Sequence, residues 1–341
     1  MAEPLSGILV TGGAGFIGSA FVRSALARRP GARVVTLDAL TYAGSTANLD
    51  GLDPDRHVFV EGDIRDGALV RQLLDEHAVG LVVHLAAESH VDRSITGPAA
   101  FVETNVLGTQ TLLDASRAAW ADAAGVRFHH VSTDEVYGDL GPDDPAFTEQ
   151  TPYAPSSPYS ASKAGSDHLV RAYARTYGLP VTITNCSNNY GPRQYPEKLI
   201  PVVIQRALDG EPIPVYGDGG NVRDWLFVGD HCDAIWAVVE RGAVGETYNV
   251  GGNAEVDNLA LVRALCAVMD DRRPEGAPHA DLVEFVTDRP GHDRRYAVDT
   301  AKIEGLGWAP GQSLRSGLEA TVDWYLGHQD WVAAVLPTEA S

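Results

Sequence analysis

The chain has 341 residues, of which 44% are hydrophobic and 21% charged, an ordinary composition for a globular enzyme with one large or two smaller domains. Its 46 acidic and 26 basic residues give a formal net charge of −20, which repels nucleic acid and anionic membranes and predicts neither as a partner. No run is long enough to span a membrane, the N-terminus lacks a signal-peptide pattern, and Cys186, Cys232 and Cys266 stand singly, so we expect a cytoplasmic protein without a disulfide framework or a metal cluster.

The first segment has the pattern of a dinucleotide-binding unit. A short buried strand, residues 7–10, leads into a glycine-rich turn over Thr11–Gly18, and a helix is expected from Ser19 to Arg29. Glycines at such a turn let backbone N–H groups approach a pyrophosphate. A second strand over residues 33–37 ends at Asp38, about 20 residues beyond the last glycine, where an acid binds a ribose 2′-hydroxyl. No arginine follows in residues 39–42, which favours NAD over NADP.

Further strands and helices alternate as in a Rossmann-type doubly wound parallel sheet of an α/β protein. Strands are expected over 58–60, 81–85 and up to Thr133, and helices over 68–77 and 98–119. Asp63, after the third strand, is placed to meet an adenine edge or to cap a helix. The helix over 159–177 and a strand over 181–185 are expected to complete the sheet.

The composition shifts after residues 188–192, where prolines punctuate an irregular mixture of helices and short strands. Helices are expected over 199–208, 230–241 and 258–269, with a strand over 213–216. We therefore predict an NAD-binding domain over residues 1–189 and a smaller mixed α/β substrate-binding domain over 190–341, with a possible return to the first domain near 224–228.

Acid and base groups gather in one short region. Thr133, Asp134 and Glu135 follow the apolar end of the fifth strand, where ligands collect in such sheets. Tyr159 and Lys163 stand at i and i+4 just after Pro158, so both side chains lie on one face of the first turns of a helix. Together they offer a hydroxyl, two carboxyls, a phenol and an ammonium. The alternative for the two acids is a solvated turn or a helix cap.

These stretches resemble the extended short-chain dehydrogenase/reductase family, and the chain is similar to its dTDP-glucose 4,6-dehydratases along most of its length. The similar stretches are 87–94, 132–138, 188–192, 196–201 and 288–293. Related epimerases and decarboxylases share the glycines and the Tyr/Lys pair, but adjacent Asp and Glu after the Thr are not expected in them. The pair Asp134 and Glu135 is therefore the specific part of the resemblance.

The resemblance implies loss of water from dTDP-glucose with a recycled NAD. Tyr159 would take the C4 hydroxyl proton, Lys163 would lower the pKa of Tyr159, and Thr133 would hydrogen-bond the C4 oxygen. NAD would take the C4 hydride. Glu135 would then remove the C5 proton, Asp134 would protonate the leaving C6 hydroxyl, and the hydride would return to C6.

The resemblance also implies which residues contact each ligand. For NAD they are Gly12, Gly15, Phe16, Ile17, Gly18, Asp38, Leu40, Thr41, Asp63, Ile64, Leu85, Ala86, Ala87, Ser89, Thr104, Tyr159, Lys163 and Asn189. For the sugar nucleotide they are Ser89, Thr133, Asn188, Glu197, Lys198, Leu199, Pro214, Tyr216, Arg223, Asn258, Asp288, Arg289, His292 and Tyr296. The two arginines would supply the local cations that a diphosphate needs on so acidic a protein.

Two other functions stay open at this point. One is a dehydratase or 4-epimerase of another nucleotide sugar on the same fold, since no residue decides the nucleobase. The other is a non-catalytic NAD-binding protein, which the intact pair of Tyr159 and Lys163 disfavours. The resemblance further implies a homodimer that packs helices 98–119 and 159–177 into a four-helix interface.

Overall fold

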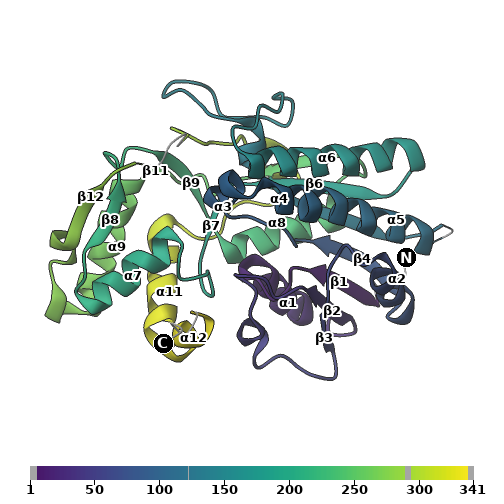
Figure 1. Ribbon diagram of the computed structural model, residues 1–341, viewed down its shortest axis with the longest axis horizontal. Coiled ribbons are helices and arrows are strands. Elements are labelled where there is room, and N and C mark those ends of the chain that lie inside the picture. The colour runs from purple at the N-terminus through teal and green to yellow at the C-terminus, as the bar shows by residue number, and fades with distance from the viewer. Residues whose placement is uncertain (1–5, 122, 289–292, 337–341) are drawn as a thin grey trace.

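Short strands with apolar residues on both faces build a seven-stranded parallel sheet in the computed structural model, which describes residues 6–121, 123–288 and 293–336 (Figure 1). The strands are β1 (Gly7–Thr11), β2 (Arg33–Asp38), β3 (His57–Glu61), β4 (Val79–His84), β5 (Arg127–Thr133), β6 (Val181–Cys186) and β10 (Thr247–Val250). Their order in the sheet is β10-β6-β5-β4-β1-β2-β3. The chain turns outward in opposite directions from β1, which confirms the predicted doubly wound fold.

Helices cover both faces of this sheet. One face carries α1 (Phe16–Arg28), α8 (Val228–Arg241) and α10 (Ala301–Glu304), and the other carries α2 (Gly67–Glu76), α5 (Thr109–Ala119) and α6 (Pro158–Tyr177). In β1, Ile8 and Val10 join the first core and Leu9 joins the second. A strand buried on both faces reads as a continuous apolar run, which is why residues 7–10 show no alternation.

The helix expected over residues 98–119 changes its geometry along its length. It begins as α4 (Pro98–Phe101), passes through a π-helical turn, η2 (Val102–Gly108), and continues as α5. Within the π-helical turn the buried Asn105 accepts from the Glu88 N–H and donates to the Glu88 carbonyl, both at 2.9 Å. Asn105 also donates to Ser162 Oγ at 2.8 Å. The turn therefore fixes the loop after β4, which precedes α3 (Val91–Thr96), against α6.

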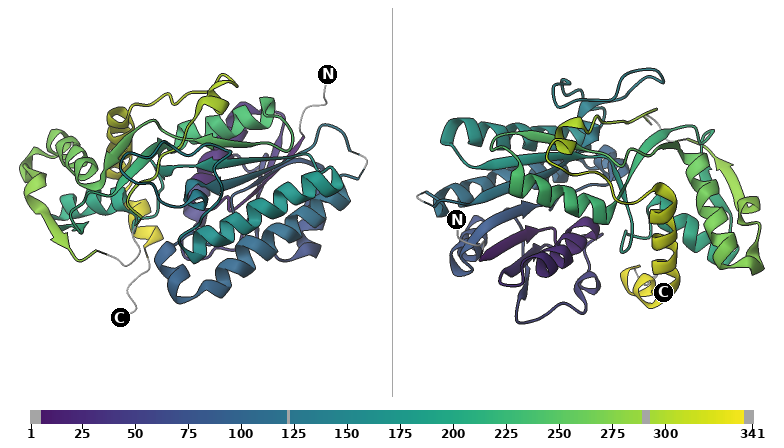
Figure 2. Two further views of the ribbon diagram at one scale, coloured as in Figure 1. Left: turned by 90° about the horizontal axis from the view of Figure 1, so that it is seen from above. Right: turned by 180° about the vertical axis from the view of Figure 1, so that it is seen from behind.

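The remaining elements form a second lobe with its own core, at the left of Figure 1 and separate from the main sheet in both views of Figure 2. A three-stranded sheet runs β11-β9-β7, and β8 pairs with β12. The lobe comprises β7 (Asn188–Tyr190), α7 (Leu199–Asp209), β8 (Ile213–Tyr216), β9 (Val222–Phe227), β11 (Glu255–Asp257), α9 (Asn258–Arg272), β12 (Val283–Val286), α11 (Leu314–Gly327) and α12 (Gln329–Val335). Short 3-10 turns occur in both lobes: η1 (Thr46–Leu49) and η3 (Asp134–Tyr137) in the first, and η4 (Pro274–Gly276) and η5 (His279–Leu282) in the second.

The chain crosses between the two lobes more than once. Strand β6 does not complete the main sheet, because β10 pairs with its outer edge. The expected return segment, 224–228, lies mostly in β9, which pairs with β7 and β11 rather than with the main sheet, and the return itself is made by α8 and β10. We therefore propose that residues 228–250 and 301–304 join residues 1–187 in the first domain.

One hydrogen bond ties the C-terminal helix to the first lobe. The indole Nε1 of Trp331 in α12 donates to Asn48 Oδ1 at 3.0 Å. Asn48 in turn donates from Nδ2 to the carbonyl of Ala14, beside the glycine-rich turn, at 2.7 Å. None of the helices over residues 6–121, 123–288 and 293–336 has the length and apolar character needed to cross a membrane.

Candidate active site

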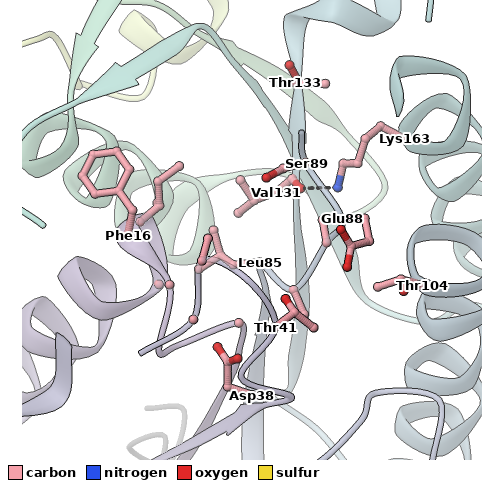
Figure 3. Close-up of a pocket in the computed structure, with 18 of the residues that line it drawn as sticks. Phe16, Asp38, Thr41, Leu85, Glu88, Ser89, Thr104, Val131, Thr133 and Lys163 are labelled. Carbon is pink, nitrogen blue, oxygen red and sulfur yellow. Dashed lines mark hydrogen bonds between the residues drawn. The ribbon is translucent and has the colours of Figure 1, made fainter. Parts of the chain in front are cut away.

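A cavity of about 490 Å³ lies at the carboxyl ends of β1, β2, β4 and β5, a size typical of small-molecule and cofactor sites (Figure 3). All the residues predicted for NAD line it except Leu40. Leu40 has a positive φ of 48° and contributes its backbone N–H to the loop. Thr133, Asp134, Glu135, Asn188 and Lys198 line the same cavity. The structure thus brings the proposed reaction groups and the proposed cofactor loop together.

Two glycines of the turn have no room for a side chain. Gly12 has a φ of +70°, and a Cβ there would lie 2.6 Å from the backbone nitrogen of Ala86. A Cβ on Gly18 would lie 2.0 Å from the carbonyl oxygen of Gly12. Helix α1 begins right after Gly15, with no side chain capping its first N–H groups. These free donors at a helix N-terminus suit a pyrophosphate.

The acid at the end of β2 is held in place by the backbone around it. Asp38 Oδ2 accepts from the N–H of Ala14, and Oδ1 accepts from the N–H of Leu40, both at 2.9 Å. Burial raises the pKa of Asp38, although these two hydrogen bonds oppose the shift. Asp63 behaves differently, because Arg65 Nη2 lies 2.6 Å from its Oδ2 and Arg65 lowers its pKa. Asp63 is thus an ion-pair partner at the rim of the cavity.

The two neighbouring carboxyls after β5 lie in different environments. Thr133 caps η3 by accepting from the Glu135 N–H at 3.3 Å, and it donates to Asp134 Oδ1 at 3.4 Å. Asp134 is 2% exposed, and its Oδ2 has no hydrogen-bond partner. Burial, followed by the charges of Glu135 and Asp224, raises its pKa well above the ordinary value. Asp134 is therefore suited to carry a proton, while Glu135 is only partly buried.

The start of α6 presents Tyr159 and Lys163 to the cavity. Ser157 caps the helix in a reciprocal pair with Ser160, and Pro158 occupies its first turn. Lys163 Nζ donates to the carbonyl of Val131 at 2.9 Å, as Figure 3 shows. The lowered pKa expected for Tyr159 is not found: burial, then the negative charge of Glu135, raise it well above the ordinary value, against a hydrogen bond with Thr133 that lowers it.

A smaller cavity of about 150 Å³ borders the first at Glu135 and Asn188 and is also lined by Arg223 and Tyr296. The Arg223 guanidinium stacks 4.4 Å from the centre of the Tyr296 ring. Its Nη2 donates to the carbonyl of Asp293 at 2.9 Å. The buried Oδ1 of Asn188 has no hydrogen-bond partner. Segments far apart in the sequence thus place an amide and a cation beside the two carboxyls.

Other predicted substrate residues lie elsewhere. Glu197 Oε1 lies 3.6 Å from Lys198 Nζ and 3.5 Å from His90 Nε2, so it binds its neighbours at the cavity rim. Five predicted contacts are in the second lobe and line neither cavity: Leu199, Pro214, Tyr216, Asn258 and Asp288. Arg289 and His292 lie outside the described residues. Asn189 donates to the Ser187 carbonyl and contacts His231, so its amide supports the loop.

Several residues that line the larger cavity were not predicted. Among them are Tyr42, Glu88, Cys186, Gln194 and Tyr195. Tyr42 follows Thr41 in the loop after β2, and that adjacency was a usable signal. Its ring lies 4.0 Å from the Arg93 guanidinium and meets Tyr195 edge to face at 5.9 Å. Gln194 and Tyr195 carry no local pattern that distinguishes them from surface residues.

Comparisons with known proteins agree over nearly the whole chain. Residues 9–321 match the profile of the family GDP-mannose 4,6 dehydratase. A dTDP-glucose 4,6-dehydratase of Xanthomonas campestris pv. campestris strain B100 is 60% identical over 337 residues, 96% of this chain and 95% of that protein. A dTDP-glucose 4,6-dehydratase of Streptomyces venezuelae, solved with NAD bound, is similar at a TM-score of 0.87 and 50% identity, covering 97% and 100% of the two chains. A UDP-glucose 4-epimerase of Thermus thermophilus in complex with NAD reaches 0.83 at 33% identity, covering 94% and 99%.

Proposed function

Because the chain belongs to the GDP-mannose 4,6 dehydratase family, we propose that it is an NAD-dependent hydro-lyase that converts dTDP-glucose to dTDP-4-keto-6-deoxy-glucose. The observation that carries this function is the pair of adjacent carboxyls after β5, one of them buried, in the same cavity as Tyr159 and Lys163. An epimerase needs to oxidise and reduce C4 alone. Two further acid/base groups at the same place fit an elimination.

The backbone that surrounds the larger cavity is suited to bind NAD. Gly12 and Gly18 leave space for a close approach of the backbone, and the N-terminus of α1 has free donors. Asp38 is fixed at the end of β2, and no arginine follows it in residues 39–42. These residues would hold NAD, which would supply the acceptor for the C4 hydride and the donor of a hydride to C6.

Tyr159 removes the proton from the C4 hydroxyl in the first step. Burial and Glu135 raise its pKa, so the ammonium of Lys163, held at Val131, must offset these effects to make the phenolate accessible. Thr133 donates a hydrogen bond to the C4 oxygen. These three groups therefore perform the oxidation half of the reaction.

Glu135 and Asp134 perform the elimination. A ketone at C4 acidifies the C5 hydrogen, and Glu135 removes it as a carboxylate; the same group returns a proton to C5 when the hydride adds to C6. The raised pKa of Asp134 keeps its carboxyl protonated, so it donates the proton with which the C6 hydroxyl leaves as water. The two roles require opposite protonation states, and burial of one carboxyl beside a partly exposed one supports them.

Arg223 and Asn188 contact the substrate, with Arg223 beside the diphosphate. We also place the protein in the cytoplasm, in keeping with its three unpaired buried cysteines and its nucleotide ligands. A homodimer through the helices 98–119 and 159–177 is supported by large apolar side chains exposed on and next to them: Ile95, Val102, Leu107 and Tyr177.

The test is to incubate the purified protein with dTDP-glucose, UDP-glucose, CDP-glucose and GDP-mannose and to follow loss of water by mass spectrometry. We expect dehydration of dTDP-glucose without added cofactor and much slower reaction of the others. Epimerised hexose without loss of water would overturn the proposed reaction. Preferential dehydration of another nucleotide sugar would overturn the substrate alone.

A further inference from the structure

Helix α6 carries a stripe of charged side chains behind the reactive cavity, which is the larger cavity lined by Asp134 and Glu135. Lys163, Asp167 and Arg171 stand four residues apart, so they follow one another along one face of the helix. Lys163 lines the reactive cavity, whereas Asp167 is 0% exposed and lies outside its lining. Arg171 lines a separate cavity of about 300 Å³ together with Tyr153. A fully buried carboxyl therefore lies between two cations, one of which serves the reaction.

The buried carboxyl of Asp167 has one hydrogen-bond partner, Tyr153, and one close neighbour, His130, whose Nε2 shares a hydrogen bond of 3.2 Å with Ser166 Oγ. Its Oδ1 lies 3.1 Å from His130 Nε2 on β5, and its Oδ2 accepts from the Tyr153 hydroxyl at 2.8 Å. Arg171 Nη2 donates to that same hydroxyl at 2.6 Å. Burial, followed by the charge of Lys163, lowers the pKa of His130 to about 4, so the imidazole is neutral at neutral pH. The neighbouring His130, followed by the charges of Lys163 and Arg171, keeps the Asp167 pKa low despite burial. His130 therefore supplies no charge to balance the carboxylate.

The other titratable groups packed around this region are uncharged at neutral pH or point elsewhere. On β4, His84 is buried between Thr11 and Thr109 with its pKa lowered well below the ordinary value by burial. On β6, burial raises the pKa of Cys186 to about 12. Burial likewise raises the pKa of Tyr137 in η3 and of Tyr153.

Two further acids, Glu149 and Glu135, lie near this region, but each lines a cavity whereas Asp167 lines none of the three. Glu149 accepts from the N–H of Asn249 at 2.9 Å and lines the cavity of Arg171. Glu135 borders the substrate side. Burial lowers the pKa of Lys163, and the charge of Asp167 is the largest effect opposing that shift.

We propose that Asp167 is a positioning residue of the reaction: its buried carboxylate, one helical turn beyond Lys163, holds the Lys163 side chain as an ammonium against the Val131 carbonyl. This inference rests on the proposed function, because it assigns to Lys163 the support of Tyr159. A neutral lysine amine would neither lower the pKa of Tyr159 nor keep a strong hydrogen bond to Val131. Oxidation of C4 would then fail at the pH where Lys163 loses its proton.

The test uses Asp167→Asn, which keeps size and an acceptor for Tyr153 but removes the charge. The rate of bound NADH formation after mixing with dTDP-glucose is measured by stopped-flow absorbance across a range of pH. An opposite charge close by changes a pKa by about 1–3 units, so the alkaline limb of this rate should move to lower pH by about one unit or more. The rate below that limb should stay within about threefold of the parent rate, since the ammonium is present there.

Three variants separate charge from packing. Asp114→Asn is the matched control, because Asp114 also accepts from a tyrosine of α6, Tyr173, at 2.8 Å but lies away from Lys163. Asp167→Glu keeps the charge and should keep the limb at the parent position. Arg171→Gln removes the other cation of the stripe at a partly exposed site, and the limb should stay or move to higher pH.

A rate of Asp167→Asn lowered equally at every pH, or an unmoved limb, would overturn the inference. If Asp167→Asn does not fold, a downward shift in Asp167→Glu or Arg171→Gln would overturn it equally. A parent protein that forms no NADH with dTDP-glucose would instead contradict the proposed function, so the two failures are distinguishable.

Discussion

The cofactor side and the substrate side of the active site are built in different ways. The cofactor side uses loops that follow strands of one sheet: Asp38 accepts from the backbone of Ala14 and Leu40, and Gly12 packs against the backbone of Ala86 in the loop after β4. The substrate side joins β7, β9 and the segment around Tyr296, which come from the second lobe and the C-terminal third of the chain. Local sequence therefore determines the first, and tertiary packing determines the second.

The largest expected effect is at Tyr159, where the two sides meet. Tyr159→Phe removes the phenol that we propose takes the C4 proton, so single-turnover formation of bound NADH should be abolished. Binding of dTDP-glucose, measured by calorimetry, should stay nearly intact, because the ring and its packing remain. Tyr177→Phe, at the exposed end of the same helix, is the control: it lines neither cavity, keeps the apolar ring assigned to the dimer interface, and should react at the parent rate. Near-normal turnover in Tyr159→Phe would remove this residue from the mechanism.

A smaller effect is expected on the substrate side, at Arg223. Arg223→Gln removes a buried cation beside the predicted diphosphate position. A hydrogen bond to a charged group contributes about 1.5–3 kcal/mol, so KM for dTDP-glucose should rise roughly tenfold to hundredfold with a smaller change in kcat. Steady-state kinetics measures both constants.

The matched control for Arg223 is Arg294→Gln. Arg294 is exposed and pairs with Asp218 at 3.3 Å, and it lines neither cavity. Its KM should equal that of the parent. An unchanged KM in Arg223→Gln, with a control that behaves as expected, would show that Arg223 only supports Tyr296 and the Asp293 carbonyl.

The smallest effect is expected on the cofactor side, at Asp38. Asp38→Asn keeps one acceptor for the surrounding N–H groups but weakens the contact to a ribose hydroxyl. The net worth of one hydrogen bond, about 0.5–1.5 kcal/mol, predicts NAD affinity lowered roughly twofold to tenfold, measured by titration of the cofactor-free protein. Asp66→Asn, at the N-terminal cap of α2, changes a similar backbone acceptor away from the cavity and should leave NAD affinity unchanged. Equal losses in both variants would assign the effect to folding.

The same division explains what the sequence could predict. The cofactor loop and the start of α6 could be predicted because local spacing in the sequence reveals them: the glycines at 12, 15 and 18, the acid at 38, and the pair Tyr159 and Lys163. The structure gathers all of these residues in one cavity. The extent of the second lobe was harder to predict from the sequence, because no local sequence pattern identifies β10 as an edge strand of the first sheet. Its pairing with β6 depends on how α8 packs, which is a tertiary property.

The pKa of Tyr159 could not be predicted from spacing alone. The i, i+4 relation to Lys163 predicts proximity, but it does not reveal that Lys163 donates to Val131 or that Glu135 opposes the phenolate. Burial also decides which of two adjacent acids holds a proton, since Asp134 and Glu135 look equivalent in the sequence. Charge balance in a buried site thus follows from three-dimensional packing.

Stopped-flow absorbance of bound NADH in Glu135→Gln and Asp134→Asn most directly tests the division of acid/base roles. Loss of a positioned acid or base slows a step by about a hundredfold to ten-thousandfold. Elimination should slow to that extent while oxidation by Tyr159 suffers less, so NADH should build up on the enzyme after mixing with dTDP-glucose. Since the pKa of Asp134 is raised, elimination in the parent should also fall as pH rises through that pKa, and Asp134→Asn should lack this limb. Dehydration at the parent rate in both variants, or loss of oxidation as complete as in Tyr159→Phe, would contradict these roles.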